Sequence, residues 1–339
     1  DKNLNNRSIK KKVSFMVKIL SLGKYLPQKV MYNNDFEKFL DTSDQWITER
    51  TGIKKRYFAS ENEAASDLAI PAINEALEKA NLNKENIDAI IVTTVTPDYF
   101  FPSTGCVILN KLGIKNVPAF DIFAGCTGFI YGLDLAKNMI ESGNYKYVMV
   151  VSVEVLSKIM DFKDRNTAVL FGDGAAAALL TKSEDQKGII SSAIFGDGEN
   201  YEDLIMPGGG SVKPATFESI NNRDHFIKMN GKAIFKRAVN YMIYATEKVL
   251  EKVGLTKHDI DLYIPHQANK RIIEAISSFF EIDSSKVFIT VDKYANISSA
   301  TIPIALYDAL YENYIKEGDK VLLTAFGAGF TYGASILQF

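Results

Sequence analysis

Apolar residues in this chain gather into short continuous runs separated by amphipathic segments. The runs at 148–153 (VMVVSV) and 321–325 (VLLTA) are the clearest, and 17–22 reads as a further strand. Continuous rather than alternating apolar runs are typical of strands in parallel or mixed sheets that helices cover on both faces. The pattern therefore predicts an α/β protein.

The same order of elements occurs twice. Residues 77–93 (LEKANLNKENIDAIIVT) match residues 250–266 (LEKVGLTKHDIDLYIPH) in register, about half the chain apart. In each copy an amphipathic helix ends, a polar turn follows and an apolar strand begins. Each half also carries a strand, a tight elbow and a helix, with Cys126 at the first elbow and Asn296 at the second. We therefore expect two similar α/β halves whose elbows approach a common centre.

The predicted boundary between the halves lies near 182–190, around the polar stretch TKSEDQKG. The expected parts are an N-terminal arm (1–15), a first half with a nucleophilic cysteine (16–185) and a second half with a histidine and an asparagine (186–339). The Lys- and Asn-rich arm has no apolar core region, so it is not expected to be a secretory signal. A solvated tail, the remnant of an organelle-targeting extension and vector-derived residues all stay open for it.

Composition narrows the class of protein. The chain has 339 residues and a formal net charge of -2, which argues against a broad nucleic-acid-binding surface. No apolar run approaches the roughly 18 residues of a membrane-spanning helix, so we expect a soluble protein. The two cysteines, Cys106 and Cys126, are too few for a disulfide framework and fit a reducing compartment.

Cys126 is the first candidate for chemistry. It follows a predicted strand and opens a helix, where the positive end of the helix dipole is expected to lower the pKa of the thiol. Gly125 and Gly128 permit a tight turn and the close approach of a thioester. A thiolate is the nucleophile that acyl transfer requires. The plain alternative is a buried, inert cysteine, and Cys106 is interpreted in that way.

Three further features accompany it. His266 ends the apolar strand LYIPH, a position suited to a catalytic imidazole, although a structural histidine is the simpler alternative. Asn296 could stabilise an enolate through its amide, or it could only adopt a left-handed turn. The glycine-containing turn at 326–330 (FGAGF) could present backbone N–H groups to an oxyanion.

These residues lie in motifs that resemble β-ketoacyl-acyl-carrier-protein synthase III, a family of thiolase-fold condensing enzymes. The resemblance runs from about residue 17 to residue 339. The resemblance rests on six motifs: TSDQWITERTGIKKR (42–56), FDIFAGCTGFIYGL (120–133), DRNTAVLFGDGA (164–175), IPHQANKRII (264–273), YANISSATIPIAL (294–306) and FGAGFTYGA (326–334). The resemblance implies a thiolase-like fold, in which two pseudo-duplicated α/β halves form a five-layer αβαβα sandwich.

The resemblance also implies a reaction. Cys126, His266 and Asn296 would form a catalytic triad, and the backbone N–H groups of Cys126 and Ala328 would form the oxyanion hole. Acetyl-CoA or another short acyl-CoA would acylate Cys126. Malonyl-acyl-carrier protein (malonyl-ACP) would then lose CO2 and condense with the acyl group, giving acetoacetyl-ACP and starting fatty-acid synthesis. His266 must stay neutral to donate a hydrogen bond in this scheme. No metal or other cofactor is expected.

Substrate and partner contacts follow from the same motifs. The expected CoA-binding residues are Thr42, Trp46, Arg50 and Arg165, with Trp46 and Arg165 on the two faces of the adenine. The expected contacts to the acidic carrier protein are Lys236, Lys270 and Arg271. Phe101 is expected to cross the interface of a homodimer into the acyl pocket of the partner. Solvated helix faces are the plain alternative for the basic residues.

The chain departs from the family pattern at two positions, with Ala328 where some members have Gly and Tyr332 where Trp is common. Two alternatives stay open: a starter-unit enzyme of a polyketide or quinolone pathway, and a non-catalytic subunit of a condensing complex. The acyl group of the primer is not determined. The location is expected to be the bacterial cytoplasm or the stroma of a plastid-type organelle.

Overall fold

The computed structural model describes residues 15–339, and nearly all of the predicted arm lies outside them. Five strands form the first sheet in the order β1-β7-β6-β4-β5. Their bounds are β1 (Val17–Tyr25), β4 (Ala89–Thr93), β5 (Ala119–Ile122), β6 (Val148–Val155) and β7 (Asp173–Lys182). β4 runs parallel to β5 and β6, whereas β7 runs antiparallel to both of its neighbours. Every residue of β4 and β6 is buried, as the apolar runs predict.

Four strands form the second sheet in the order β11-β12-β13-β8. Their bounds are β8 (Gly188–Gly196), β11 (Leu262–Pro265), β12 (Lys320–Gly327) and β13 (Thr331–Gln338). β7 ends at Lys182 and β8 begins at Gly188, so the strands of the two sheets separate in the sequence within the predicted boundary region. The division of the chain into domains at residue 185 stays a prediction.

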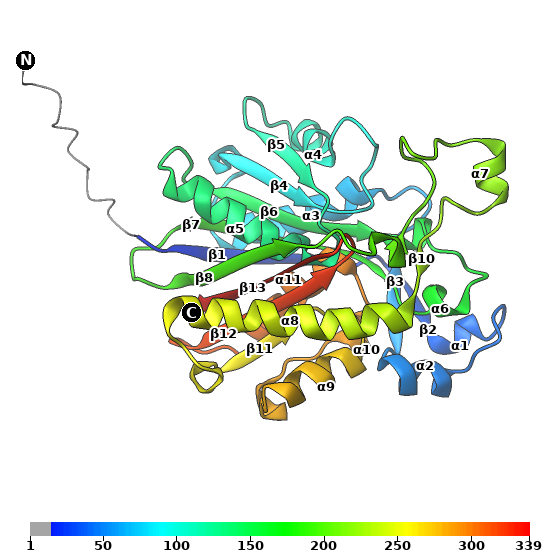
Figure 1. The fold of residues 1–339 in the computed structure, drawn as a ribbon. Helices are drawn as coiled ribbons and strands as arrows, with labels where there is room; N and C mark the ends of the chain where they lie inside the picture. Colours follow the sequence, from blue (N-terminus) through cyan, green and yellow to red (C-terminus); the bar gives the residue numbers. More distant parts are fainter. Residues whose placement is uncertain (1–14) are drawn as a thin grey trace, which may run out of the picture.

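Helices form three layers around the two sheets (Figure 1). α3 (Ala65–Lys79) and α4 (Thr104–Leu112) cover the outer face of the first sheet. α5 (Gly128–Glu141) and α11 (Thr301–Tyr311) lie between the sheets. α8 (Gly231–Val253) and α9 (Lys270–Phe279) cover the second sheet from outside. The order of layers is αβαβα, which confirms the predicted fold.

The central core lies where α5 and α11 pack between the sheets. Phe129 and Leu133 of α5, Leu306 of α11, Val150 of β6 and Leu323 of β12 are all fully buried there. Burial of one such side chain contributes about 1.5–3 kcal/mol. Because both elbow helices belong to this core, the core also fixes the two elbows from which they start.

A smaller subdomain lies beside the second sheet. It holds β2 (Lys29–Tyr32), α1 (Asn33–Phe36), α2 (Asp44–Thr51), β3 (Lys55–Phe58), α6 (Arg165–Ala168) and α10 (Val291–Tyr294). Fully buried Arg56 connects it: the guanidinium donates to Asn33 Oδ1 at 2.7 Å and to Val169 O at 2.6 Å, and it stacks on Phe36. Burial lowers the pKa of Arg56 to about 9. Asn33 Nδ2 in turn donates to Asp44 Oδ1 of α2 at 2.8 Å, so these bonds join α1, α2 and the end of α6 within the subdomain.

An excursion of the chain between β8 and α8 carries β9 (Leu204–Ile205), α7 (Phe217–Asn221) and β10 (Lys228–Met229). α7 projects from the body in Figure 1. Arg223 Nε donates to Asp161 Oδ2 at 2.7 Å and anchors the base of this excursion. Within residues 15–339, no helix is both long enough and apolar enough to cross a membrane.

Candidate active site

Cys126 lies at the elbow that the sequence predicts. β5 ends at Ile122, the 3₁₀ turn η2 (Gly125–Thr127) follows, and α5 begins at Gly128. Gly125 has φ +52°, a left-handed conformation that suits glycine. A Cβ added at Gly128 would lie 2.8 Å from Thr93 Cβ, so only glycine lets α5 start this close to the sheet.

The turn at 326–330 packs directly against this elbow. A Cβ on Gly327 would lie 2.5 Å from the backbone nitrogen of Cys126, and one on Gly125 would lie 2.8 Å from that of Ala328. Thr331 Oγ1 donates to Ala124 O at 2.6 Å and holds the two segments together. The backbone nitrogens of Cys126 and Ala328 therefore belong to adjacent segments beside the thiol, which is the arrangement that an oxyanion hole requires.

His266 follows β11 and is 3% exposed. Its backbone N–H donates to Thr324 O at 2.8 Å, which continues the parallel pairing of β11 with β12. Its ring Nδ1 lies 2.6 Å from Thr301 Oγ1 on α11. Burial lowers the pKa of His266 to about 3, so the imidazole is neutral, as the expected donor role requires.

Asn296 is held by both its backbone and its side chain. Its backbone N–H donates to Leu170 O and its carbonyl accepts from Gly172 N–H, each at 3.0 Å. Its side-chain Oδ1 accepts from the Ser298 N–H at 2.8 Å. Because the acceptor atom is occupied by a backbone donor, the amide presents its two Nδ2 hydrogens as the groups available to a substrate.

One cavity contains Cys126, His266 and Asn296 together. Polar contacts also connect the three residues through the second elbow. Thr301 Oγ1 lies 3.1 Å from Ser298 O, the Ser298 N–H binds Asn296, and the Ser298 side chain hydrogen-bonds the Cys126 thiol. The structure thus brings the three predicted residues to a common centre, with Ser298 beside Cys126 and Asn296 and joined to His266 through Thr301.

The expected lowering of the thiol pKa was wrong. Burial raises the pKa of Cys126 to about 12, and the nearby Glu154 carboxyl adds to the rise, whereas the Ser298 hydrogen bond opposes it. The start of the helix is present, but Cys126 is only partly exposed, and desolvation of the thiol outweighs the effect of the helix start. Desolvation disfavours the charged thiolate, so the resting residue is a thiol.

Cys126 also opens onto a second, apolar cavity. Its lining includes Val95, Leu156, Ile159, Leu204, Met206 and Ile227, together with Ala328 of the turn. Leu204, Met206 and Ile227 come from the excursion that carries α7. The thiol therefore lies at the junction of the cavity that holds His266 and Asn296 and a cavity whose lining is mostly apolar.

The comparisons agree with this arrangement. A family model described as 3-oxoacyl-[acyl-carrier-protein (ACP)] synthase III matches residues 120–198, and the model of its C-terminal part matches residues 250–339. The beta-ketoacyl-[acyl-carrier-protein] synthase III of Caldanaerobacter subterraneus subsp. tengcongensis is 51% identical over 320 residues, 94% of this chain and 97% of that protein. The chain belongs to the β-ketoacyl-acyl-carrier-protein synthase III family.

A second relative of the same name, from Natranaerobius thermophilus, is 49% identical over 95% of this chain and 98% of its own length. The crystal structure of the 3-oxoacyl-[acyl-carrier-protein] synthase III from Aquifex aeolicus VF5 has a TM-score of 0.88 and 45% identity, and it covers 95% of this chain and 100% of that one. The predicted family is confirmed and is favoured over the polyketide alternative. As a synthase III, the chain is an acyltransferase of fatty-acid biosynthesis.

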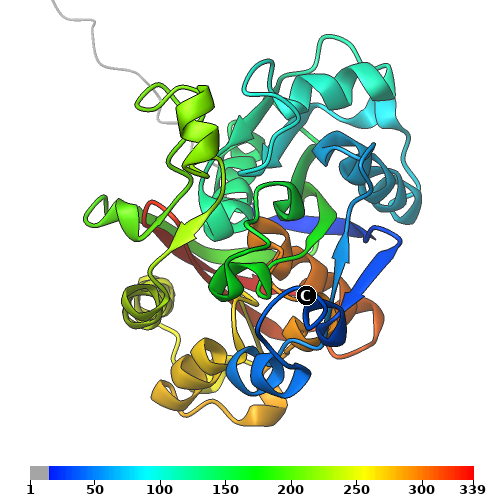
Figure 2. The same ribbon diagram turned by 90° about the vertical axis from the view of Figure 1, so that its right-hand side faces the viewer.

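Three of the predicted CoA-binding residues of this synthase III, Trp46, Arg50 and Arg165, lie together. Arg50 contacts Asn269, which lines the cavity of the catalytic candidates, and we call this region the mouth of the site. The ring centroid of Trp46 lies 4.8 Å from Arg50 Cζ and 4.9 Å from Arg165 Cζ, so both guanidiniums lie near the indole. Thr42 Oγ1 is buried and has no hydrogen-bond partner in the described part of the chain. Asn269 Nδ2 donates to Arg50 O at 3.2 Å, which joins the start of α9 to α2. Figure 2 shows α2 (blue) beside α9 (gold).

The basic residues predicted for the carrier protein lie around this mouth as well. Lys236, Lys270 and Arg271 are all exposed. Arg271 Cζ lies 5.8 Å from the ring centroid of Phe235, which lines the cavity of the catalytic candidates. Lys270 Nζ lies 3.7 Å from Glu274 on the same helix.

Phe101 and Cys106 lie away from the two cavities described above. Phe101 is 84% exposed, beside the similarly exposed Phe100, and it lines neither cavity described above. Cys106 is exposed on α4, so its interpretation as a core residue was wrong. Exposure of Cys106 follows from its place on the outward face of a helix that covers the first sheet.

Thr301, Ser298 and Glu154 belong to the site and were missed by sequence reasoning. Glu154, at the end of β6, accepts from Thr96 Oγ1 at 2.9 Å and Ser299 Oγ at 2.8 Å, and burial raises its pKa. The polar run ISSAT at 297–301, inside an otherwise apolar stretch, was the available signal. A hydroxyl run that starts a buried helix must find partners in the core.

Proposed function

We propose that this synthase III joins a short acyl group from acyl-CoA to the malonyl carbon of malonyl-ACP through an acyl-Cys126 intermediate. The observation that carries the proposal is the position of Cys126 at the junction of two cavities, with His266 and Asn296 in one and mostly apolar side chains in the other. A thioester arm fits the first cavity and the acyl group fits the second.

In the first stage the Cys126 sulfur attacks the carbonyl carbon of the acyl-CoA. A bond forms between that carbon and Cys126, the bond to the CoA sulfur breaks, and the thiol proton ends on free CoA. Two backbone donors beside the sulfur support this step, and Ala328 N lies next to the elbow. In our proposal the N–H groups of Ala328 and Cys126 both face the developing oxyanion. The thiol is protonated at rest, so loss of its proton accompanies the attack.

In the second stage malonyl-ACP replaces CoA. Its thioester carbonyl accepts hydrogen bonds from His266 Nε2 and Asn296 Nδ2, which stabilise the enolate formed when the bond to the carboxylate breaks and CO2 leaves. The enolate carbon then attacks the acyl carbonyl, the new carbon–carbon bond forms, and the bond to Cys126 breaks. Cys126 regains one proton and the product is a β-ketoacyl-ACP.

The groups around the mouth support the expected partners. Trp46 and the two arginines beside it offer a π surface and positive charge to the CoA nucleotide. Lys236, Lys270 and Arg271 offer a basic rim to an acidic carrier protein. In our proposal the reaction uses these protein groups and the thioesters alone; among residues 15–339 no cluster of His, Cys, Asp and Glu could hold a metal ion.

We further propose a homodimer formed along β5. This strand is the edge of the first sheet, and Phe120, Phe123, Phe100 and Phe101 are exposed on or beside it. An exposed edge with large apolar side chains is a surface that a second copy can cover. The bacterial origin of the relatives named above supports a bacterial cytoplasm over a plastid as the location.

The test is a condensation assay with malonyl-ACP and a panel of acyl-CoA primers, read by mass spectrometry of the carrier protein. We expect the wild-type protein to form β-ketoacyl-ACP from short primers and Cys126→Ala to form none. Transfer of the unextended acyl group to the carrier, without condensation, would instead support a starter-unit enzyme. Lack of any product with every primer would contradict the proposal.

A further inference from the structure

The backbone on both sides of Asn296 is strained. Ala295 has φ +61° and ψ -161°, and Ser298 has φ +45°. A residue with a Cβ rarely adopts such conformations, and they persist only where the surroundings enforce them. Something outside the elbow must therefore hold Asn296 where it is.

The backbone of Asn296 is bonded directly to Leu170 and Gly172, and a further hydrogen bond joins the two flanks of the elbow. Tyr294, the residue before Ala295, donates from its hydroxyl to Asp308 Oδ2 at 2.7 Å. Asp308 belongs to α11, the helix that follows the elbow, and only 2% of its side chain is exposed. The bond therefore closes a loop of the chain that contains Asn296, Ser298 and Thr301.

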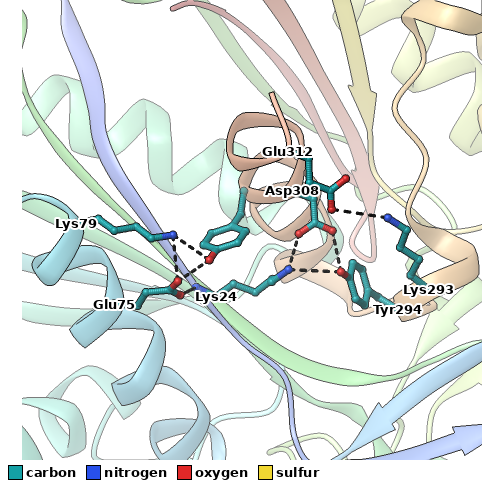
Figure 3. A network of polar contacts seen from close by, with 8 residues as sticks. Lys24, Glu75, Lys79, Lys293, Tyr294, Asp308 and Glu312 are labelled. Carbon is teal, nitrogen blue, oxygen red and sulfur yellow. Dashed lines mark hydrogen bonds and ion pairs between the residues drawn. The ribbon is translucent and has the colours of Figure 1, made fainter. Parts of the chain in front are cut away.

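A cation from the other half of the molecule completes the anchor. The Asp308 Oδ1 atom forms an ion pair with Lys24 Nζ, and the backbone N–H of Lys24 donates to Glu75 Oε2 at 2.7 Å. Lys24 lies near the end of β1, and Glu75 lies on α3. Figure 3 shows the Lys24 ammonium between Tyr294 and Asp308.

We propose that Tyr294, Asp308 and Lys24 are positioning residues for the Asn296 amide. They keep the strained elbow closed, so that the Nδ2 atom meets the thioester carbonyl during decarboxylation. The inference rests on the proposed role of Asn296 in the second stage. It assigns these residues no contact with the substrate, and the first stage does not depend on them.

Tyr307 provides a matched control within the same network. It lies on α11 next to Asp308, and its hydroxyl donates to Glu75 Oε1 at 2.5 Å. Within the described part of the chain its hydroxyl bonds Glu75 and Lys79 of the same network and not Tyr294. Tyr294→Phe and Tyr307→Phe each delete one hydroxyl that donates to a carboxylate.

The experiment compares the two stages in both variants, with the intact protein and malonyl-ACP. We expect Tyr294→Phe to lower kcat for malonyl-ACP decarboxylation on the order of tenfold, while acylation of Cys126 stays within about twofold of wild type. We expect Tyr307→Phe to lose about as much thermal stability as Tyr294→Phe but to decarboxylate malonyl-ACP at the wild-type rate. Adding Ala295→Gly to Tyr294→Phe should restore decarboxylation, because glycine adopts the elbow conformation without strain.

Equal losses of decarboxylation in the two Phe variants, or equal losses of both stages in Tyr294→Phe, would overturn the inference. If Tyr294→Phe fails to fold, Lys24→Met, which leaves the tyrosine in place, is expected to show the same selective loss at smaller size. Unchanged decarboxylation in Lys24→Met would then overturn it. A wild-type protein that acylates Cys126 but never decarboxylates malonyl-ACP would overturn the proposed function itself.

Discussion

The Nδ1 atom of His266 lies 2.6 Å from the hydroxyl oxygen of Thr301. The same hydroxyl lies 3.1 Å from Ser298 O, a carbonyl that also accepts the backbone N–H of Thr301. The Gln267 N–H points at the hydroxyl oxygen, at 3.4 Å. The donor role that we propose for His266 requires the Thr301 proton to lie in the shorter bond with Nδ1, which leaves the proton of the neutral imidazole on Nε2. This tautomer is the one that can donate to a thioester carbonyl.

Thr301→Val should remove this control of the tautomer. We expect malonyl-ACP decarboxylation to fall by about ten- to a hundredfold, because Nδ1 loses its donor and Nε2 loses its fixed proton. Acylation of Cys126 should change much less. Thr301→Ser retains the hydroxyl and serves as the control, with near wild-type decarboxylation. Full activity in Thr301→Val would show that another group orients His266.

The depressed pKa of His266 predicts a dependence of stability on pH. The folded chain holds the imidazole neutral down to about pH 3, whereas the unfolded chain binds a proton below about pH 6.5. The unfolded state therefore gains a proton first, and stability falls as the pH drops through this range. Wild type should lose about 2 kcal/mol more than His266→Gln between about pH 6.5 and 4.5. Parallel urea-unfolding curves for the two proteins across that range would contradict the assignment.

The raised pKa of Cys126 predicts how the free enzyme reacts with alkylating reagents. Only the thiolate reacts, so below the pKa the rate of iodoacetamide addition should rise about tenfold per pH unit. Because burial raises this pKa to about 12, the rise should continue without a plateau to about pH 10. The Cys106→Ser background leaves one thiol to follow by mass spectrometry. A plateau between about pH 7 and 8 would mean that the helix start outweighs burial.

Trp46→Ala tests the mouth of the site. Loss of the indole should raise KM for acyl-CoA by about tenfold, since a stacking surface next to Arg50 and Arg165 is removed. A truncated primer thioester without the nucleotide should react equally well with variant and wild type. An equal loss with both primers would indicate that Trp46 supports the fold of α2 instead of the nucleotide.

Much of the site follows from patterns along the chain. The apolar runs predict β6 and β12, and the half-chain repeat places Cys126 and Asn296 at equivalent elbows, which the structure brings into one cavity. These features depend on residues that are close together in the sequence, so a pattern along the chain can predict them. The motif around His266 needed the family resemblance, because a strand-end histidine by itself has many roles.

The remainder depends on contacts between distant segments. Thr301 and His266 are 35 residues apart, and Ser299 and Glu154 are 145 apart, so no local pattern joins them. The wrong direction for the Cys126 pKa has the same origin. The helix start is visible in the sequence, but the burial that outweighs it depends on how distant segments, such as the turn at 326–330, pack around the elbow.

The central claim is that Cys126 carries the acyl group. The most direct measurement is intact-protein mass spectrometry after mixing with acetyl-CoA alone, followed by peptide mapping. Acylation should add about 42 Da, one acetyl group replacing one hydrogen, to the peptide that contains Cys126. The adduct should persist in His266→Ala and be absent from Cys126→Ala. No adduct with any short acyl-CoA, or an adduct that survives in Cys126→Ala, would contradict the account.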